Sequence, residues 1–109
     1  GTIVNVGSVA GIIAGGSSLP YAVSKAALHH LTRTLAQALA PDVRVNAVAP
    51  GLVETPWTAG WEANEAIVAR TPLGRAATPE DIADAVVSLA RTPFATGQIV
   101  VVDGGLTLT

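Results

Sequence analysis

The sequence of 109 residues lacks cysteine, and it has few aromatic residues and no long apolar run. The missing cysteines exclude disulfides, thiolate metal ligands and thiol nucleophiles. Aromatic residues make up only 4% of the chain, which favours helices packed on a sheet over an aromatic-rich β-barrel. No apolar run approaches the roughly 20 residues that span a bilayer, and the first residues do not read as a signal peptide. We therefore expect a cytoplasmic protein without a membrane partner.

Charge is also scarce, at 13% of residues with a net charge of −2. The six basic residues are scattered, so the sequence offers no attraction for phosphate backbones and predicts no nucleic-acid partner. Half of the residues are apolar, mostly alanine, valine, leucine and isoleucine, which is typical of a packed core. The length allows one domain at most.

The first half of the chain predicts a strand, a helix and a second strand. Residues 2–7 form a short apolar run typical of a buried parallel strand, and the Gly/Ser-rich residues 8–20 indicate a loop. Residues 21–40 predict a helix that stops at Pro41, and Val43–Ala49 predicts the next strand. The helix carries a stripe of leucines at helical spacing: Leu28, Leu31, Leu35 and Leu39.

The second half adds a helix and a strand. Residues 52–75 are irregular, with a short helix expected around Glu62–Arg70. Thr78–Asp81 combines a Thr cap, a proline and two acids, which predicts a helix start. Gln98–Val102 predicts the last strand. The order β-α-β-α-β with uniformly apolar strands predicts an α/β fold, with a parallel sheet covered by helices on both faces.

Tyr21 and Lys25 stand four positions apart in the expected helix, so they share one helical face. An ammonium close to a phenol stabilises the phenolate, which can turn this weakly acidic group into an acid/base catalyst. Ser8 follows the first strand, and its hydroxyl could hold a substrate oxygen against the phenol. Ligands of such sheets bind outside the carboxyl ends of the strands, where Ser8 and the segment Pro50–Thr55 are both expected.

In order and spacing, these motifs resemble the classical short-chain dehydrogenase/reductase (SDR) family over essentially the whole chain. The motifs are Ser8, Tyr21-x-x-x-Lys25, Arg44 to Gly51 followed by Thr55, and Asp103-Gly104-Gly105. A lone Tyr-x-x-x-Lys is unspecific, but the ordered set is highly specific. The resemblance implies a partial Rossmann-like, doubly wound parallel sheet that corresponds to the last three strands of the family fold.

The resemblance also implies roles for single residues. Tyr21 would be the general acid/base, Lys25 would support its phenolate and bond the nicotinamide ribose, and Ser8 would orient the substrate oxygen. The nicotinamide carboxamide would be held by the residues that follow the second strand: Pro50, Gly51, Val53 and Thr55. The reaction would be hydride transfer between NAD or NADP and a carbonyl or alcohol substrate. NAD versus NADP and the identity of the substrate stay open.

Two family motifs do not occur in these residues: the glycine-rich turn Thr-Gly-x-x-x-Gly-x-Gly and the Asn-Asn-Ala-Gly motif. The glycines of Gly11–Gly16 have another spacing, so we interpret them as a substrate-side loop. The chain begins at Gly1 without a methionine. We therefore expect residues 1–109 to form one partial domain, the catalytic and substrate-determining half of a dehydrogenase. Alone, it should be inactive and poorly folded, with an unpaired edge on its first strand.

Other residues have simpler interpretations. Asn46 is expected to bond the backbone of a neighbouring turn, and Arg75 and Asp81 could form an ion pair. His29 and His30 point about 100° apart on a helix, so they predict no metal site and are expected at the surface or a subunit interface. Two tryptophans lie in the segment that forms the family's substrate lid. Trp57 and Trp61 could line an apolar substrate pocket or anchor the lid on the core.

Two hypotheses about function remain. The first is an NAD(P)-dependent carbonyl reductase or alcohol dehydrogenase that acts on a small molecule. The second is a noncatalytic fragment or pseudo-enzyme that works only through association with a partner chain. In either case the resemblance implies a homodimer or homotetramer formed through the helix Tyr21–Ala40.

Overall fold

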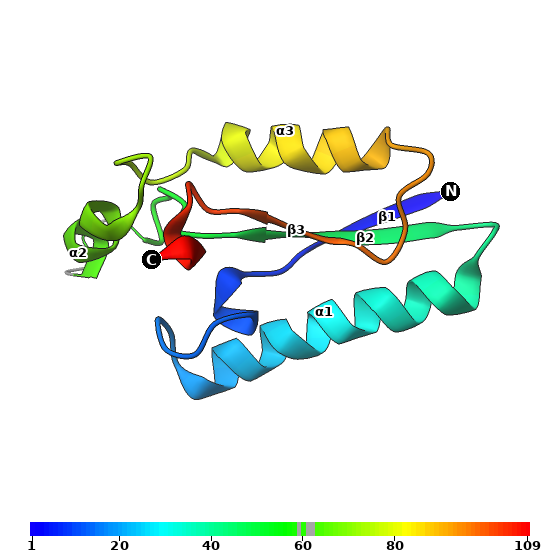
Figure 1. The fold of residues 1–109 in the computed structure, drawn as a ribbon, viewed down its shortest axis with the longest axis horizontal. Coiled ribbons are helices and arrows are strands. Elements are labelled where there is room, and N and C mark those ends of the chain that lie inside the picture. Colours follow the sequence, from blue (N-terminus) through cyan, green and yellow to red (C-terminus); the bar gives the residue numbers. More distant parts are fainter. Residues whose placement is uncertain (59, 61–62) are drawn as a thin grey trace.

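The computed structural model describes residues 1–58, 60 and 63–109. Three parallel strands form one sheet in the order β1-β2-β3: β1 (Thr2–Val6), β2 (Arg44–Pro50) and β3 (Ile99–Val102). The predicted strands and their parallel arrangement are thus confirmed, with bounds that differ by at most one residue. All three strands point toward the end of the molecule where α2 (Ala63–Arg70) and the C-terminus lie (Figure 1).

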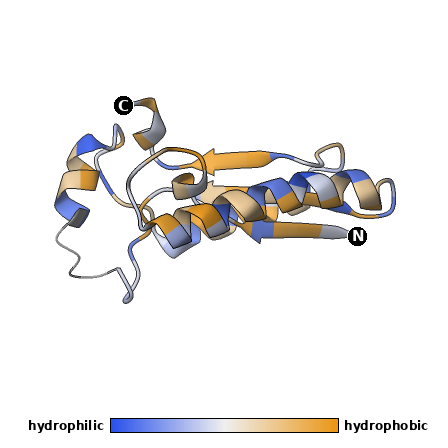
Figure 2. Cartoon of the chain, turned by 90° about the horizontal axis from the view of Figure 1, so that it is seen from below, coloured by the Kyte–Doolittle hydropathy of each residue, from blue (hydrophilic) through white to orange (hydrophobic). Residues whose placement is uncertain are grey.

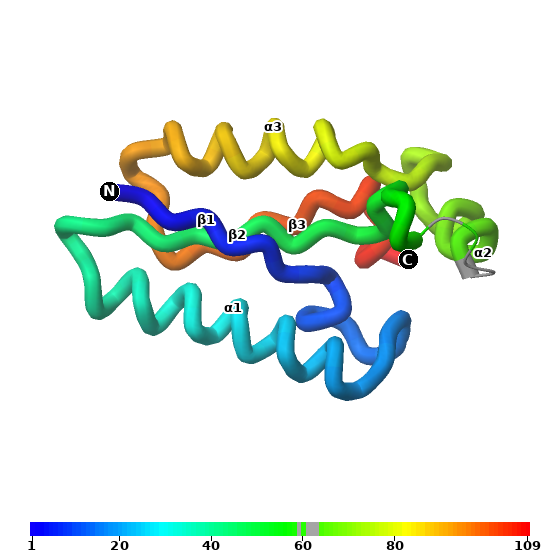
Figure 3. Tube along the Cα trace, turned by 180° about the vertical axis from the view of Figure 1, so that it is seen from behind, coloured from blue at the N-terminus to red at the C-terminus, as the bar shows by residue number. Residues whose placement is uncertain are grey.

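Helices cover both faces of the sheet, as the sequence predicts. The helix α1 (Leu19–Leu39) lies along one face and α3 (Pro79–Ala90) along the other (Figure 1), and the view from behind shows the same layers (Figure 3). The strands are hydrophobic over most of their length, whereas α1 alternates between hydrophobic and hydrophilic turns (Figure 2). The central strand is the best protected, because Val45–Ala49 have no exposed surface.

The helix α1 begins earlier than the sequence predicts. Ser18 caps it, since its hydroxyl accepts a hydrogen bond from the Tyr21 amide at 3.4 Å. Pro20 was expected to end the preceding loop, but it lies in the first turn of the helix, where an amide hydrogen is not needed. The leucine stripe is not the most buried face either: Leu31 is 47% exposed, whereas the polar Thr32 is fully buried.

The face of α1 that meets the sheet is therefore partly polar. Thr32 Oγ1 donates to the Leu28 carbonyl at 2.8 Å and accepts from Asn5 Nδ2 of β1 at 3.1 Å. Ala36, which is also buried, lets the backbones of helix and sheet approach each other. On the opposite face, Ile82 and Leu89 of α3 pack with Val48 in an ordinary apolar core.

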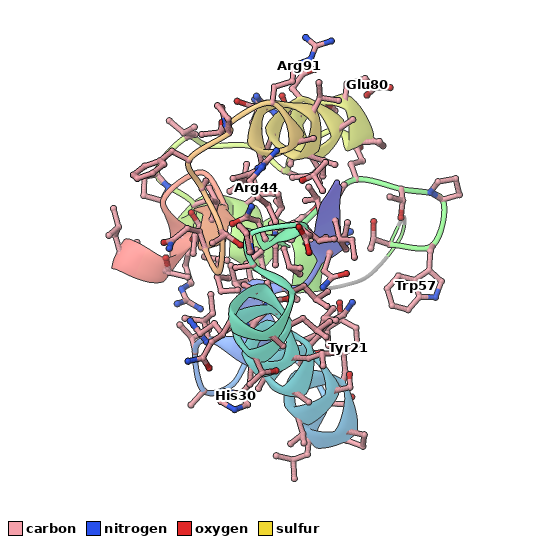
Figure 4. All side chains as sticks on the ribbon, turned by 90° about the vertical axis from the view of Figure 1, so that its right-hand side faces the viewer. Tyr21, His30, Arg44, Trp57, Glu80 and Arg91 are labelled. Carbon is pink, nitrogen blue, oxygen red and sulfur yellow. The ribbon has the colours of Figure 1, made fainter. Side chains whose placement is uncertain are left out.

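Two side chains of β2 fasten the loop that joins α3 to β3. Asn46 is fully buried, donates to the Ala95 carbonyl at 2.9 Å and accepts from the Gln98 amide at 3.0 Å, which confirms its expected structural role. Arg44 lies between the sheet and α3 (Figure 4). Its guanidinium donates to four backbone carbonyls at the end of that helix and beyond it: Leu89, Ala90, Thr92 and Ala95.

The predicted start of α3 is also confirmed. Thr78 and Asp81 form a reciprocal capping box, and Arg75 donates to Asp81 at 2.7 Å in the expected ion pair. Within the described part of the chain, none of the helices combines the length and the apolar character needed to cross a bilayer.

Candidate active site

Ser8 lies where β1 ends and a short 3₁₀ helix, η1 (Val9–Gly11), begins. The residue is extended, with φ of −167° and ψ of 149°, and only 9% exposed. Its hydroxyl oxygen caps η1 by accepting a hydrogen bond from the Ala10 amide at 3.1 Å. Because this contact uses a lone pair of the oxygen, the hydroxyl hydrogen is left to donate to a ligand.

Tyr21 and Lys25 lie one turn apart on α1, and both are half-buried. The Lys25 ammonium lies 5.6 Å from the centre of the Tyr21 ring, close enough for a favourable cation–π interaction. The same ammonium donates to the Val6 carbonyl at 3.1 Å, at the end of β1 and just before Ser8. Lys25 therefore connects the tyrosine to the strand end that carries the serine.

His29 is the residue that the sequence interpretation misplaced. His30 is exposed (Figure 4), but His29 is only 3% exposed, so the expected surface or subunit-interface position is wrong for His29. Its Nε2 accepts a hydrogen bond from the Ser8 amide at 3.2 Å. The spacing held a signal for this, because residues 21, 25 and 29 recur every four positions and so follow one side of the helix.

The environment of His29 favours its neutral form. Burial lowers the pKa of His29 below its ordinary value, and the positive charges of Arg33 and Lys25 lower it further. A neutral ring is also what the hydrogen bond requires, since Nε2 can accept only when it carries no proton. The geometry and the charges thus agree on the same state of the ring.

The segment after β2, residues 51–55, lies at the same end of the sheet, but it is hydrogen-bonded to β3 and to the segment before α3 rather than to α1. The Gly51 amide donates to the Val102 carbonyl at 3.1 Å, and Val53 forms a parallel bridge with Ala77. The Thr55 hydroxyl lies 3.3 Å from that of Thr58. These contacts orient the predicted Pro50–Thr55 group toward β3 and the segment before α3, and they do not join it to Tyr21.

Trp57 is 71% exposed and points away from the body of the molecule (Figure 4). Its partner in the sequence interpretation, Trp61, lies outside the described residues. A hollow of about 230 Å³ lies near the end of β3, lined among others by Leu52, Leu73 and Asp103. Its lining includes none of the predicted catalytic residues.

The donors around Lys25 suit a ligand that carries several hydroxyl groups. An ammonium has three N–H donors, and the Val6 carbonyl takes one of them. The other donors, together with the Tyr21 hydroxyl, match the hydroxyls of a ribose. The residues present therefore fit the sugar end of a nicotinamide cofactor.

A parallel sheet with helices on both faces defines the Rossmann-like class of α/β proteins, and comparisons with known proteins identify the family. The model of a family described as enoyl-(acyl carrier protein) reductase matches residues 1–107. The chain belongs to the short-chain dehydrogenase/reductase family.

Individual relatives agree with this assignment. The short-chain dehydrogenase/reductase homolog YusR of Bacillus subtilis is 51% identical over 109 residues, which cover 99% of this chain and 84% of the relative. The 3-oxoacyl-[acyl-carrier-protein] reductase FabG of Thermotoga maritima is 44% identical over 113 residues, which cover 99% of this chain but 46% of that protein. Compared with FabG, this chain thus spans about half of the length.

Solved structures show the same fold. A 3-oxoacyl-[acyl-carrier protein] reductase from Brucella melitensis with bound NAD matches with a TM-score of 0.90 and 41% identity, over 100% of this chain and 42% of that one. ElxO with bound NADP matches with a TM-score of 0.89 and 30% identity, over 100% of this chain and 47% of that one. Both cofactors therefore occur among the structural relatives.

Proposed function

We propose that this chain carries the catalytic and substrate-facing half of an NAD(P)-dependent oxidoreductase that interconverts a carbonyl and an alcohol. The observation that supports this most directly is the position of the Lys25 ammonium, 5.6 Å from the Tyr21 ring and 3.1 Å from the Val6 carbonyl. One cation thus holds the phenol against the strand end that delivers Ser8.

Each of the three residues has a separate task in this proposal. In the reducing direction, Tyr21 gives its hydroxyl proton to the substrate oxygen, and Ser8 donates a hydrogen bond to the same oxygen. The Lys25 ammonium stabilises the phenolate that remains and binds ribose hydroxyls with its other N–H groups. When bound, the nicotinamide supplies or accepts the hydride. Pro50, Gly51, Val53 and Thr55 hold the carboxamide.

The test is a kinetic assay of the full-length protein with NADH and NADPH against a panel of carbonyl compounds. Tyr21→Phe removes the proton donor and keeps the ring, so kcat should fall by about 10²–10⁴-fold with an unchanged circular dichroism spectrum. Ser17→Ala, at an exposed position before α1, is the matched control and should keep full activity. A Tyr21→Phe variant as active as the wild type would refute the proposal.

A noncatalytic role through association is the second candidate, and the edge of the sheet favours it. The strand β1 is an outer strand, and its residues Ile3 and Val6 are 42% and 48% exposed. Open strand edges with apolar side chains readily pair with further chain. Calorimetric titration with NADH separates the two candidates, because a purely associating protein should bind a partner but no dinucleotide.

We also propose self-association through α1, as a homodimer or homotetramer. Leu19 and Val23 on this helix are 81% and 65% exposed, and exposed apolar side chains on one helix are typical of an interface. Light scattering of the full-length protein tests this, since Val23→Asp should shift the mass toward the monomer. An unchanged mass would contradict the assignment of the interface to α1.

A further inference from the structure

Ser8 makes two hydrogen bonds within its own turn and one across the fold. In the 3₁₀ turn, the Ala10 amide donates to the Ser8 hydroxyl oxygen at 3.1 Å, and the Gly11 amide donates to the Ser8 carbonyl at 3.0 Å. Across the fold, His29 of α1 accepts a hydrogen bond from the Ser8 amide at 3.2 Å. Loss of the Ala10 contact would free the side chain to rotate, whereas loss of the His29 contact would remove a hydrogen bond that ties this turn to α1.

Gly7 provides the space for this arrangement. A Cβ atom on Gly7 would lie 2.0 Å from His29 Nε2, so the ring occupies the volume that a side chain at position 7 would need. Close packing on the Gly7 backbone, together with 3% exposure, holds the imidazole in place. The ring therefore acts as a fixed support against which the end of β1 is set.

We propose that His29 is a positioning residue: its imidazole holds the Ser8 amide and thereby aims the Ser8 hydroxyl at the substrate oxygen beside Tyr21. This inference rests on the proposed oxidoreductase function. Lys25, one turn earlier, makes the converse contact, because its ammonium donates to the Val6 carbonyl at 3.1 Å. The helix α1, which carries the acid/base tyrosine, thus binds the residues on both sides of Gly7. These two contacts set the distance between Tyr21 and Ser8.

The arrangement depends on the charge state of the ring. A proton on Nε2 would turn the acceptor into a donor facing the Ser8 N–H, and the contact would be lost. The charges that act on the ring are those of Lys25 and Arg33, both cations on α1. The packed elements β1 and η1 have no ionisable side chain, and the only one of β2, Arg44, is bound by carbonyls near α3. Acid should therefore disable the site through His29 only below the ordinary pKa of histidine.

The first test needs no catalytic activity. Long-range ¹H–¹⁵N correlation spectra of the full-length protein report which ring nitrogen carries the proton, and His29→Gln identifies the His29 signals by their loss. We expect a bare Nε2 and a protonated Nδ1 that persist below pH 6.5, the ordinary pKa of histidine. A proton on Nε2 at neutral pH would overturn the proposal whether or not the protein is an oxidoreductase.

The second test compares replacements of the ring. Gln places an oxygen acceptor near the position of Nε2 and does not titrate, whereas Leu fills the space without an acceptor. We expect His29→Leu to lower kcat roughly ten- to a hundredfold, as for misplaced reacting groups. His29→Gln should restore most of kcat and remove the acid limb of its pH profile. His30→Gln, on the exposed neighbour, should leave both unchanged.

The outcomes separate the two proposals. If Tyr21→Phe abolishes turnover but His29→Leu and His29→Gln behave alike, the proposed function stands and the positioning role of His29 falls. If the spectra show the expected tautomer but no carbonyl compound is turned over, the hydrogen bond between the Ser8 amide and His29 is supported. The role of His29 in catalysis is then refuted together with the proposed function.

Discussion

The backbone of Gly11 lies directly against the backbone of Ala26. A Cβ atom on Gly11 would come within 2.7 Å of the Ala26 nitrogen and of the Lys25 carbonyl carbon. The 3₁₀ turn after Ser8 can therefore rest on α1 only because position 11 has no side chain. This approach is made by main-chain atoms, which cannot rotate out of the way.

Gly11→Ala should push η1 away from α1. We expect a loss of about 1–3 kcal/mol in the free energy of unfolding, the usual cost of overpacking, together with a lower kcat because Lys25 is displaced. Urea denaturation and steady-state kinetics measure the two effects. Ser17→Ala is the control, since Ser17 is exposed and does not have a positive φ. Equal stability of Gly11→Ala and wild type would contradict the expected clash.

Arg44→Met should loosen the end of α3 from the sheet. The change removes a charged donor from four carbonyls, among them Ala90 at 2.7 Å and Thr92 at 2.8 Å. We expect the free energy of unfolding to fall by about 1.5–3 kcal/mol, typical of hydrogen bonds to charged groups. Arg44→Lys should recover only part of this, because an ammonium cannot reproduce the guanidinium fork. Arg91→Met, on an exposed cation, is the control and should stay near wild type.

The capping box of α3 should give the protein an acid-sensitive contribution to stability. A hydrogen bond from Arg75, and then one from the Thr78 amide, lowers the pKa of Asp81 from 3.8 to about 2. Since the folded pKa lies below the unfolded one, the contribution is complete above pH 3.8 and is lost as the pH falls toward about 2. Asp81→Asn should therefore lower Tm at neutral pH, and the difference from wild type should shrink in this window. Asp84→Asn, on an exposed carboxylate of the same helix, is the control for the loss of one surface charge at neutral pH.

Trp57→Ala should separate the two interpretations of this side chain. With 71% of the residue exposed, truncation removes little buried surface, so we expect Tm to stay close to that of wild type. If Trp57 lines the substrate site, KM for bulky carbonyl compounds should rise while KM for small ones stays the same. Unchanged kinetics across the panel, together with a lower Tm, would instead identify an anchor for the segment after Thr55.

The sequence predicted the features that local chemistry determines. The Thr78 cap, the apolar strands and the amide of Asn46 all act through near neighbours or through a regular pattern, and the structure confirms them. Ser18 was missed because Pro20 was taken as a loop residue, although proline also suits the first turn of a helix.

The burial of His29 depends on a contact between residues far apart in the chain. A histidine on an Ala/Leu-rich helix resembles a surface residue until Gly7 is brought against it. For the same reason, the ordered SDR motifs indicated Ser8, Tyr21 and Lys25 but did not indicate His29, which binds the Ser8 amide. A glycine directly before the serine was the remaining clue.

The backbone amides of β2 are better protected from solvent than the Ser8 amide at the end of β1, and this difference has a kinetic consequence. Residues Val45–Ala49 of β2 are enclosed on all sides, so their amides should exchange with deuterium only when the whole sheet opens. The Ser8 amide follows an outer strand and is bonded to α1 rather than to the sheet, so a local opening between this strand end and α1 frees it without unfolding of β2. Deuterium should thus enter the β1–η1 corner long before it reaches the neighbouring strand. The carboxyl edge of the sheet, where Ser8 lies, should therefore open and close many times before the sheet itself unfolds.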